Sequence, residues 1–270
     1  MPKIETDNGA LHYEVLDATP PWLDTTETIL FHHGVAIDSG IWAGWPPSLS
    51  DRYRLVTFDV RGYGQSNIPD DGFDWSFEVL AKDVLAVADA ADAAKFHFVG
   101  ESMGGAMGLY LAIHHPDRLL SITPCTSPSR GGAVQWLVEW RDYIEEHGID
   151  GWSERMMGRR FYPGRLSRNA EKWFAETQAS SAPQSVLGHG EMLLGVDLLP
   201  QLPSITTPVH LIASDGSPFL PLSTTLEIRD AIPGSEMDVI PNSRHGVVFS
   251  HAEQCAQSLR AFLERNLVTQ

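Results

Sequence analysis

The sequence predicts an α/β fold in which helices flank a mostly parallel central sheet, with a helical insertion in the second half of the chain. Apolar, β-rich runs alternate with stretches whose apolar residues recur at helical spacing. Such alternation indicates βαβ units and therefore a parallel sheet. Between residues 129 and 197 the alternation stops and helical periodicity prevails. We therefore expect one core domain from residues 1–128 and 198–270, with residues 129–197 as a helical cap.

The first elements follow from local patterns. Residues 10–16 (ALHYEVL) alternate polar and apolar side chains, as an edge strand does. Residues 27–34 (ETILFHHG) and 53–64 (YRLVTFDVRGYG) are β-rich runs that end in glycine. Apolar residues at helical spacing predict a helix over 76–91. These patterns place two strands and a helix after the edge strand.

The remaining core elements flank the insertion. Residues 95–100 (KFHFVG) form a predicted strand, and the following helix over 103–116 stops at Pro116, which cannot continue it. Further strands are predicted over 119–127, 206–214 and 236–243, and a closing helix over 251–267. The insertion itself carries Trp136, Trp140, Trp152, Trp173, Met156 and Met157. These side chains either line an apolar pocket or pack the cap against the core, and the sequence leaves both open.

Composition limits the classes of partner. The chain has 270 residues, enough for one sizeable core, and its 35 acidic and 19 basic residues give a formal net charge of −16. That charge argues against a nucleic-acid or anionic-membrane partner, because a polyphosphate ligand needs a basic surface. We expect a small-molecule substrate, and a homodimer stays open.

Cysteine usage and the N-terminus predict a cytoplasmic protein without metal. Cys125 and Cys255 stand far apart and have neither metal-ligand spacing nor a disulfide framework. The start of the chain lacks the apolar segment of a signal peptide, and no run approaches the length of a membrane span. No HExxH motif is present either. We therefore expect no metal and no cofactor.

A glycine-rich turn after the strand at 95–100 carries the chemistry. Dinucleotide binding requires G-x-G-x-x-G, which the spacing of Gly100, Gly104 and Gly105 does not match. Residues 100–104 (GESMG) do match G-x-S-x-G. In that motif the serine occupies a strained strand-to-helix corner from which its hydroxyl projects above the sheet. Ser102 is therefore the candidate nucleophile.

A serine nucleophile needs a base and an oxyanion site. His245 follows a predicted strand and precedes the last helix, which is where this motif expects its base. A rate that rises through one ionisation near neutral pH would be typical of such a base. The backbone N–H groups of Met103 and Val35 are the expected oxyanion donors, with Gly34 letting the loop turn sharply. We expect His33 to brace that loop.

Taken together, these motifs resemble the α/β-hydrolase-fold serine hydrolases over nearly the whole chain. The likeness rests on HHG (32–34), DVRGYGQS (59–66), GESMGG (100–105), HPDRL (115–119) and RHG (244–246). The chain is most similar to the branch of enol-lactonases, esterases and C–C-bond hydrolases. The resemblance implies Ser102 as nucleophile, His245 as base and a helical cap over the pocket. It also implies that Asp59 and Arg61 hold a turn together and are not catalytic.

The third member of the triad departs from this family pattern. The acid usually follows the strand here at 206–214, in a pattern like G-x-x-D-x-x-x-P, and that position falls on Ser217. Asp215 stands two residues earlier, and an extended chain would displace it by about 6–7 Å. We expect Asp215 to orient His245, with Ser217 as the alternative.

The leading interpretation is a serine hydrolase of a small ester or lactone that acts through a Ser102 acyl-enzyme. A C–C bond hydrolase of a vinylogous diketone would use the same residues. A ligand receptor without catalysis is a further alternative, because a fold does not determine a function.

Overall fold

The computed structural model describes residues 2–23, 25–134 and 137–267, and within them eight strands form one sheet. The strand order is β1-β2-β4-β3-β5-β6-β7-β8. β1 and β2 pair antiparallel, as do β2 and β4, and every other neighbouring pair is parallel. The strands span Lys3–Ile4 (β1), Leu11–Leu16 (β2), Thr28–His32 (β3), Arg54–Phe58 (β4), Phe96–Glu101 (β5), Leu119–Cys125 (β6), His210–Ser214 (β7) and Glu236–Ile240 (β8).

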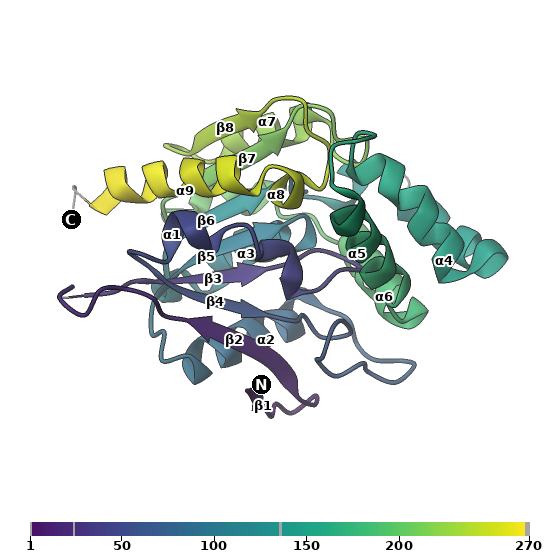
Figure 1. The fold of residues 1–270 in the computed structure, drawn as a ribbon, viewed down its shortest axis with the longest axis horizontal. Helices are drawn as coiled ribbons and strands as arrows, with labels where there is room; N and C mark the ends of the chain where they lie inside the picture. Colours follow the sequence, from purple (N-terminus) through teal and green to yellow (C-terminus); the bar gives the residue numbers. More distant parts are fainter. Residues whose placement is uncertain (1, 24, 135–136, 268–270) are drawn as a thin grey trace.

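Helices cover both faces of this sheet (Figure 1). α1 packs on α9, and α9 lies against β7 and β8, while α2 and α3 pack together and α3 lies against β5 and β6. β3 shows the alternation behind these two layers. Ile29 and Phe31 pack into the apolar cluster of α9, whereas Leu30 between them packs into the cluster of α2 and α3. The helices of the core are Pro46–Leu49 (α1), Phe77–Ala90 (α2), Met103–His114 (α3), Leu222–Ala231 (α7), Val247–Ser250 (α8) and Ala252–Leu267 (α9).

The predicted α/β fold is confirmed, and the predicted core elements lie close to the observed ones. β1 was not predicted, because its two residues are too few to show a periodicity. Gly34 also differs from expectation. Its backbone does not adopt a positive φ, and a Cβ there would lie 2.0 Å from a carboxylate oxygen of Glu101. Glycine is needed at this position for close approach and not for a sharp turn.

Helices α4 (Trp140–Arg160), α5 (Arg168–Ala179) and α6 (Pro183–Leu194) lie together at one end of the sheet (Figure 1). The two ends of this segment meet. The Leu198 N–H donates to the Ser129 carbonyl at 2.8 Å, and the backbones of Arg130 and Asp197 form an isolated antiparallel β-bridge. We therefore propose that residues 129–197 are an insertion into a core built from residues 1–128 and 198–270. Trp136 lies outside the described residues.

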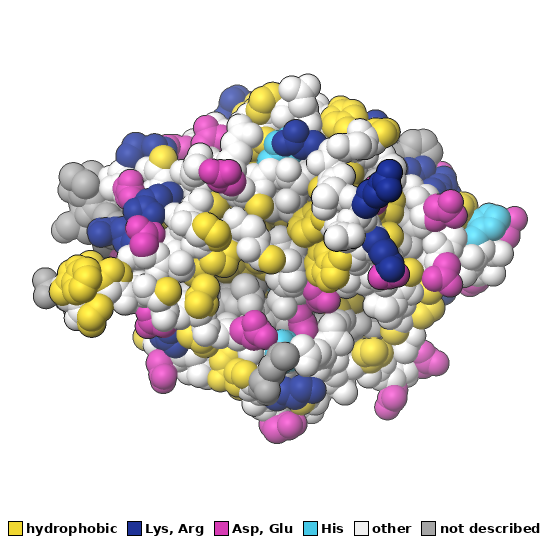
Figure 2. Space-filling model, in the orientation of Figure 1, with side chains coloured by type: hydrophobic (Ala, Val, Ile, Leu, Met, Phe, Trp, Pro, Cys, Tyr) yellow, Lys and Arg dark blue, Asp and Glu magenta, His cyan; other side chains and the backbone are white. Residues whose placement is uncertain are grey.

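The surface carries charges of both signs. Acidic and basic side chains are interspersed over the face that Figure 2 shows. None of the described helices combines the length and the apolarity needed to cross a bilayer.

The turn after β4 holds two buried charged side chains, as the motif implies. The Asp59 carboxylate accepts hydrogen bonds from the Ser39 and Gln65 N–H groups at 3.0 and 2.9 Å. The fully buried Arg61 guanidinium donates to both carboxylate oxygens of Asp83, on α2, at 2.8 and 2.6 Å. Both residues therefore join the turn to its surroundings.

Replacing Arg61 by methionine should lower the free energy of unfolding by about 3–5 kcal/mol, because the Asp83 charge is then buried without a partner. Urea unfolding followed by circular dichroism measures this change. Adding Asp83→Leu to Arg61→Met should restore part of the loss. Lys82→Met, which breaks an exposed pair with Glu78, should have little effect and serves as the control. An Arg61→Met protein as stable as the wild type would contradict a buried ion pair.

Candidate active site

Ser102 lies at a strained corner between β5 and α3. Its backbone has φ 55° and ψ −111°, a conformation that costs a non-glycine residue free energy. The Ser102 N–H donates to the Cys125 carbonyl of β6 at 2.9 Å, which holds the corner to the sheet. A Cβ at Gly104 would lie 2.3 Å from the His32 carbonyl, so α3 can start this close to β3 only with glycine there. The sequence places the serine at this corner as expected.

His245, from the loop after β8, reaches this serine. Its Nε2 lies 3.0 Å from the Ser102 hydroxyl, and the imidazole is almost completely buried. Its Nδ1 lies 3.2 Å from the Ser217 hydroxyl, which also accepts a hydrogen bond from the Leu220 N–H. With the proton on Nδ1 donated to Ser217, Nε2 is free to accept the proton of Ser102. This arrangement allows the serine to be activated as a nucleophile.

The expectation that Asp215 orients His245 is wrong in this structure. The Asp215 carboxylate is exposed and accepts hydrogen bonds from the Asn242 and Ser243 N–H groups at 2.9 and 3.0 Å. It therefore stabilises the turn before His245, where Asn242 has a positive φ of 55°. Ser217 contacts the imidazole instead, because Asp215 lies two residues back along the chain. The orienting group is thus a hydroxyl without charge.

The two expected oxyanion donors flank the serine. Val35 lies in the loop after β3 and lines the same pocket as Ser102, and Met103 is the first residue of α3. In the described part of the chain, neither backbone N–H has an acceptor. His33 braces this loop as predicted, because its Nε2 accepts from the Val60 N–H at 2.8 Å and its Nδ1 donates to the Gly34 carbonyl at 2.8 Å.

The insertion contributes a buried arginine that sequence reasoning missed. Arg160, at the end of α4, donates to the Val35 carbonyl at 2.9 Å and to Gln178 at 2.6 Å. Its own carbonyl accepts from the Gly246 N–H at 3.0 Å, next to His245. Arg160 therefore joins the insertion to both loops of the site. No local pattern around residue 160 indicated this role, because its partners come from distant parts of the chain.

Burial sets the protonation of the imidazole. Desolvation, helped by the Arg160 charge, lowers the pKa of His245 to about 3. The expectation of a histidine ionisation near neutral pH is therefore not met. The imidazole is neutral, and so able to accept a proton, throughout the neutral pH range.

A second missed residue is Glu101, directly before the serine. Its side chain is 2% exposed, and desolvation raises its pKa to about 7, although the Arg160 charge and the Gly34 N–H lower it. The signal that could have identified it was a carboxylate at the apolar end of a central strand, inside the G-x-S-x-G motif.

The pocket at Ser102 is narrow. Apolar side chains from the insertion and from the loop after β7 line it together with His245 and Arg160, among them Leu137, Trp140, Leu193, Phe219 and Leu220. About 20 Å³ of it is open to the centre of a water molecule, little more than one water requires. Trp140 faces this pocket, whereas the fully buried Trp152 packs against Trp140. Trp140 thus lines the pocket and Trp152 packs behind it, so the structure contains both arrangements that the sequence leaves open.

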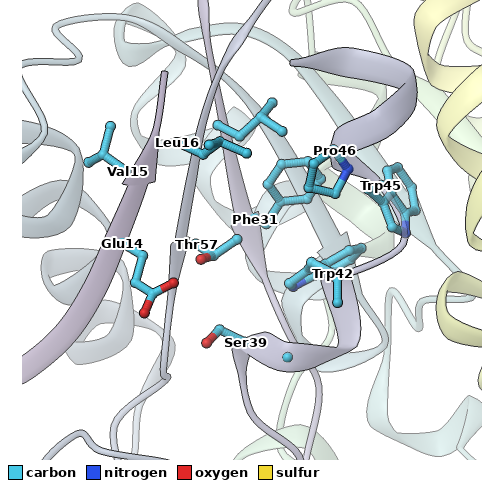
Figure 3. Close-up of a pocket in the computed structure, with 12 residues that line it drawn as sticks. Glu14, Val15, Leu16, Phe31, Ser39, Trp42, Trp45, Pro46 and Thr57 are labelled. Carbon is cyan, nitrogen blue, oxygen red and sulfur yellow. The ribbon is translucent and has the colours of Figure 1, made fainter. Parts of the chain in front are cut away.

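A roomier hollow of about 340 Å³ lies elsewhere on the core (Figure 3). Glu14, Val15 and Leu16 of β2 form one side of it, and Trp42 and Trp45 form the other. Neither Ser102 nor His245 lines it. We therefore place the chemistry in the narrower pocket. Among the residues described, no three His, Cys, Asp or Glu side chains are grouped so that they could hold a metal ion.

The chain is similar to known proteins over most of its length. The family model for the alpha/beta hydrolase fold matches residues 27–252. The chain is 28% identical to "Putative carbamate hydrolase RutD" of Agrobacterium fabrum, covering 94% of this chain and 98% of that protein. It is 26% identical to 3-oxoadipate enol-lactonase 1 of Acinetobacter baylyi, covering 88% of each.

Solved structures show the same fold. The enol-lactonase from Burkholderia xenovorans LB400 superposes with a TM-score of 0.88 at 22% identity, covering 97% of this chain and 100% of that one. A thermophilic esterase from Thermogutta terrifontis gives a TM-score of 0.85 at 21% identity, covering 98% of each.

The contacts of His245 predict opposite outcomes for two neighbouring substitutions. Ser217→Ala removes the acceptor for the Nδ1 proton and should lower kcat for an activated ester by about 10- to 100-fold. This is less than the ~10⁴-fold loss that follows replacement of a triad acid, because no charge is removed. Asp215→Asn, the control, should keep kcat within about twofold, since among the described residues its carboxylate bonds to the Asn242 and Ser243 N–H groups and not to His245. Steady-state kinetics of both variants measure kcat. A loss of kcat in Asp215→Asn but not in Ser217→Ala would support Asp215 as the group that orients His245.

Proposed function

This chain belongs to the α/β-hydrolase family, and from that premise we propose that it is a serine hydrolase which cleaves small carboxylic esters or lactones. One observation carries the proposal. The Ser102 hydroxyl lies 3.0 Å from Nε2 of a buried imidazole whose other nitrogen contacts a hydroxyl. A nucleophile, a base and an orienting group in hydrogen-bond reach of one another are the arrangement that acyl transfer requires.

The reaction proceeds in two halves. In the first half, Ser102 attacks the substrate carbonyl while Nε2 of His245 takes the hydroxyl proton. The N–H groups of Val35 and Met103 stabilise the resulting oxyanion. Collapse breaks the bond to the leaving oxygen, which takes the proton from the imidazolium. In the second half, water repeats the attack on the acyl-enzyme with His245 again as the base, and the acid product leaves.

The pocket and the relatives support this class of substrate. The lining is apolar apart from Ser102, His245 and Arg160, which favours substrates with an apolar part next to the carbonyl. The names of two relatives, an enol-lactonase and a carbamate hydrolase, both refer to a carbonyl attached to a heteroatom leaving group. A lactone opens by the same two steps and keeps its leaving oxygen within the product.

A fluorophosphonate probe tests the nucleophile. The wild type should be labelled on Ser102, and Ser102→Ala and His245→Ala should lose labelling and ester hydrolysis. Each loss in kcat should be about 10³-fold or more, because nucleophile and base act as one unit. Peptide mapping by mass spectrometry locates the label. A folded wild type that resists the probe and hydrolyses no ester would support a receptor without catalysis.

A substrate panel tests the reaction class. p-Nitrophenyl esters of increasing chain length, small lactones, aryl carbamates and vinylogous diketones should be compared by kcat/KM. Because the pocket is narrow and apolar, short-chain esters and lactones should be turned over fastest. Preferred cleavage of the diketones would instead assign C–C bond hydrolysis to the same residues.

A further inference from the structure

Glu101 is a buried carboxylate without a hydrogen bond. It ends β5, and neither of its two carboxylate oxygens has a partner among the described residues. The Gly34 backbone lies against Oε2, and its N–H lowers the pKa of Glu101 from a position outside full hydrogen-bond geometry. A buried polar group in this condition costs free energy, so its retention calls for a functional explanation.

The groups that face this carboxylate come from three elements. His245, from the loop after β8, places Nε2 3.6 Å from Oε1. Arg160, at the end of α4, acts on Glu101 through its charge. Cys125, at the end of β6, pairs with Glu101 in the sheet, and burial raises the pKa of its thiol so that the thiol is neutral. Glu101 therefore lies close to one imidazole and is influenced by one fixed positive charge.

That imidazole lacks the charge that a triad normally supplies. In a Ser-His-Asp triad the carboxylate stabilises the imidazolium that forms during acyl transfer. Here Nδ1 faces the Ser217 hydroxyl, which orients the ring and carries no charge. The nearby Arg160 opposes the imidazolium. Within the described part of the chain, Glu101 is the carboxylate that the structure brings within 4 Å of His245.

We propose that Glu101, from the Nε2 side, supplies the negative charge that stabilises the His245 imidazolium in place of the triad carboxylate. This inference rests on the serine-hydrolase function proposed above. Nε2 takes the proton of Ser102 as the oxygen–carbon bond forms, and that proton then passes to the leaving oxygen. Glu101 acts through its charge and is not consumed. It acts through the imidazole and is a positioning residue.

The sign of the pH dependence follows from this role. Burial raises the pKa of Glu101 to about 7, so the group is neutral below that pH and charged above it. The imidazole, whose pKa is lowered to about 3, is already neutral below that range and does not limit the rate. Only charged Glu101 stabilises the imidazolium. The rate should therefore increase as the pH rises through about 7.

Glu101→Gln removes the charge and keeps the shape. Kinetics of p-nitrophenyl ester hydrolysis and the rate of fluorophosphonate labelling of Ser102 are measured from pH 5 to 9 on the full chain. At pH 9 the variant should lose about 10- to 100-fold in kcat with little change in KM, the effect of one to two pKa units of lost charge stabilisation. At pH 5 the variant and the wild type should converge. The variant's profile should be flat where the wild type rises.

Rescue separates electrostatics from structure. Ser217→Asp places a carboxylate at Nδ1. Added to Glu101→Gln, it should therefore raise kcat at pH 9 by at least about tenfold over Glu101→Gln alone. Ser217→Ala should lower the rate at every pH and keep the ionisation near pH 7. Thermal unfolding of each variant confirms that it is folded.

Three results would overturn the inference. They are an unchanged pH profile in Glu101→Gln, an equal loss at every pH, and no rescue by Ser217→Asp in a folded double variant. If any of these results is found while wild-type Ser102 is labelled normally, the proposed role of Glu101 is wrong and the proposed function stands. Absence of labelling in the wild type removes the proposed function and this inference together.

Discussion

The left-handed backbone at Ser102 is the constraint on which the rest of the site depends. A serine in this conformation is strained, so the surrounding structure must hold it. Its N–H is tied to β6, and the start of α3 lies against the backbone of β3 where only glycine fits. The same corner presents the hydroxyl to His245 and starts α3 at Met103, whose N–H is an expected oxyanion donor. The strained backbone at Ser102 thus sets the positions of the Ser102 hydroxyl and the Met103 N–H.

Burial gives this site its electrostatics. His245, Arg160 and Glu101 are each almost completely buried. Charges in the protein interior interact more strongly than charges at the surface. The same desolvation lowers the pKa of the imidazole and raises that of the carboxyl. The group at Nδ1 of the ring is the Ser217 hydroxyl. The missing charge can come from another direction, because electrostatic stabilisation depends on distance and not on which nitrogen is bonded.

The insertion is part of the site and not only a roof above it. Arg160 bonds to the loop of Val35 and, through its carbonyl, to the loop of His245. Cap residues such as Leu137 and Trp140 line the pocket and pack into the same apolar cluster as α2 and α3. Any movement of the insertion therefore also acts on the loops that carry Val35 and His245.

The sequence by itself determined the fold, the strand-to-helix corner at Ser102 and the position of His245 after the last strand, since these depend on local patterns. Strand and helix periodicity extends over a few residues, and the elbow motif spans five. Only the tertiary structure decided which group orients His245 and that Glu101 and Arg160 share its surroundings. Ser102 and His245 are 143 positions apart, and His245 and Ser217 are 28 apart. Two residues along an extended chain span about 6–7 Å. This distance explains why Ser217 contacts His245 and Asp215 does not. Burial, which sets every pKa here, is likewise a property of the packed molecule and of no single segment.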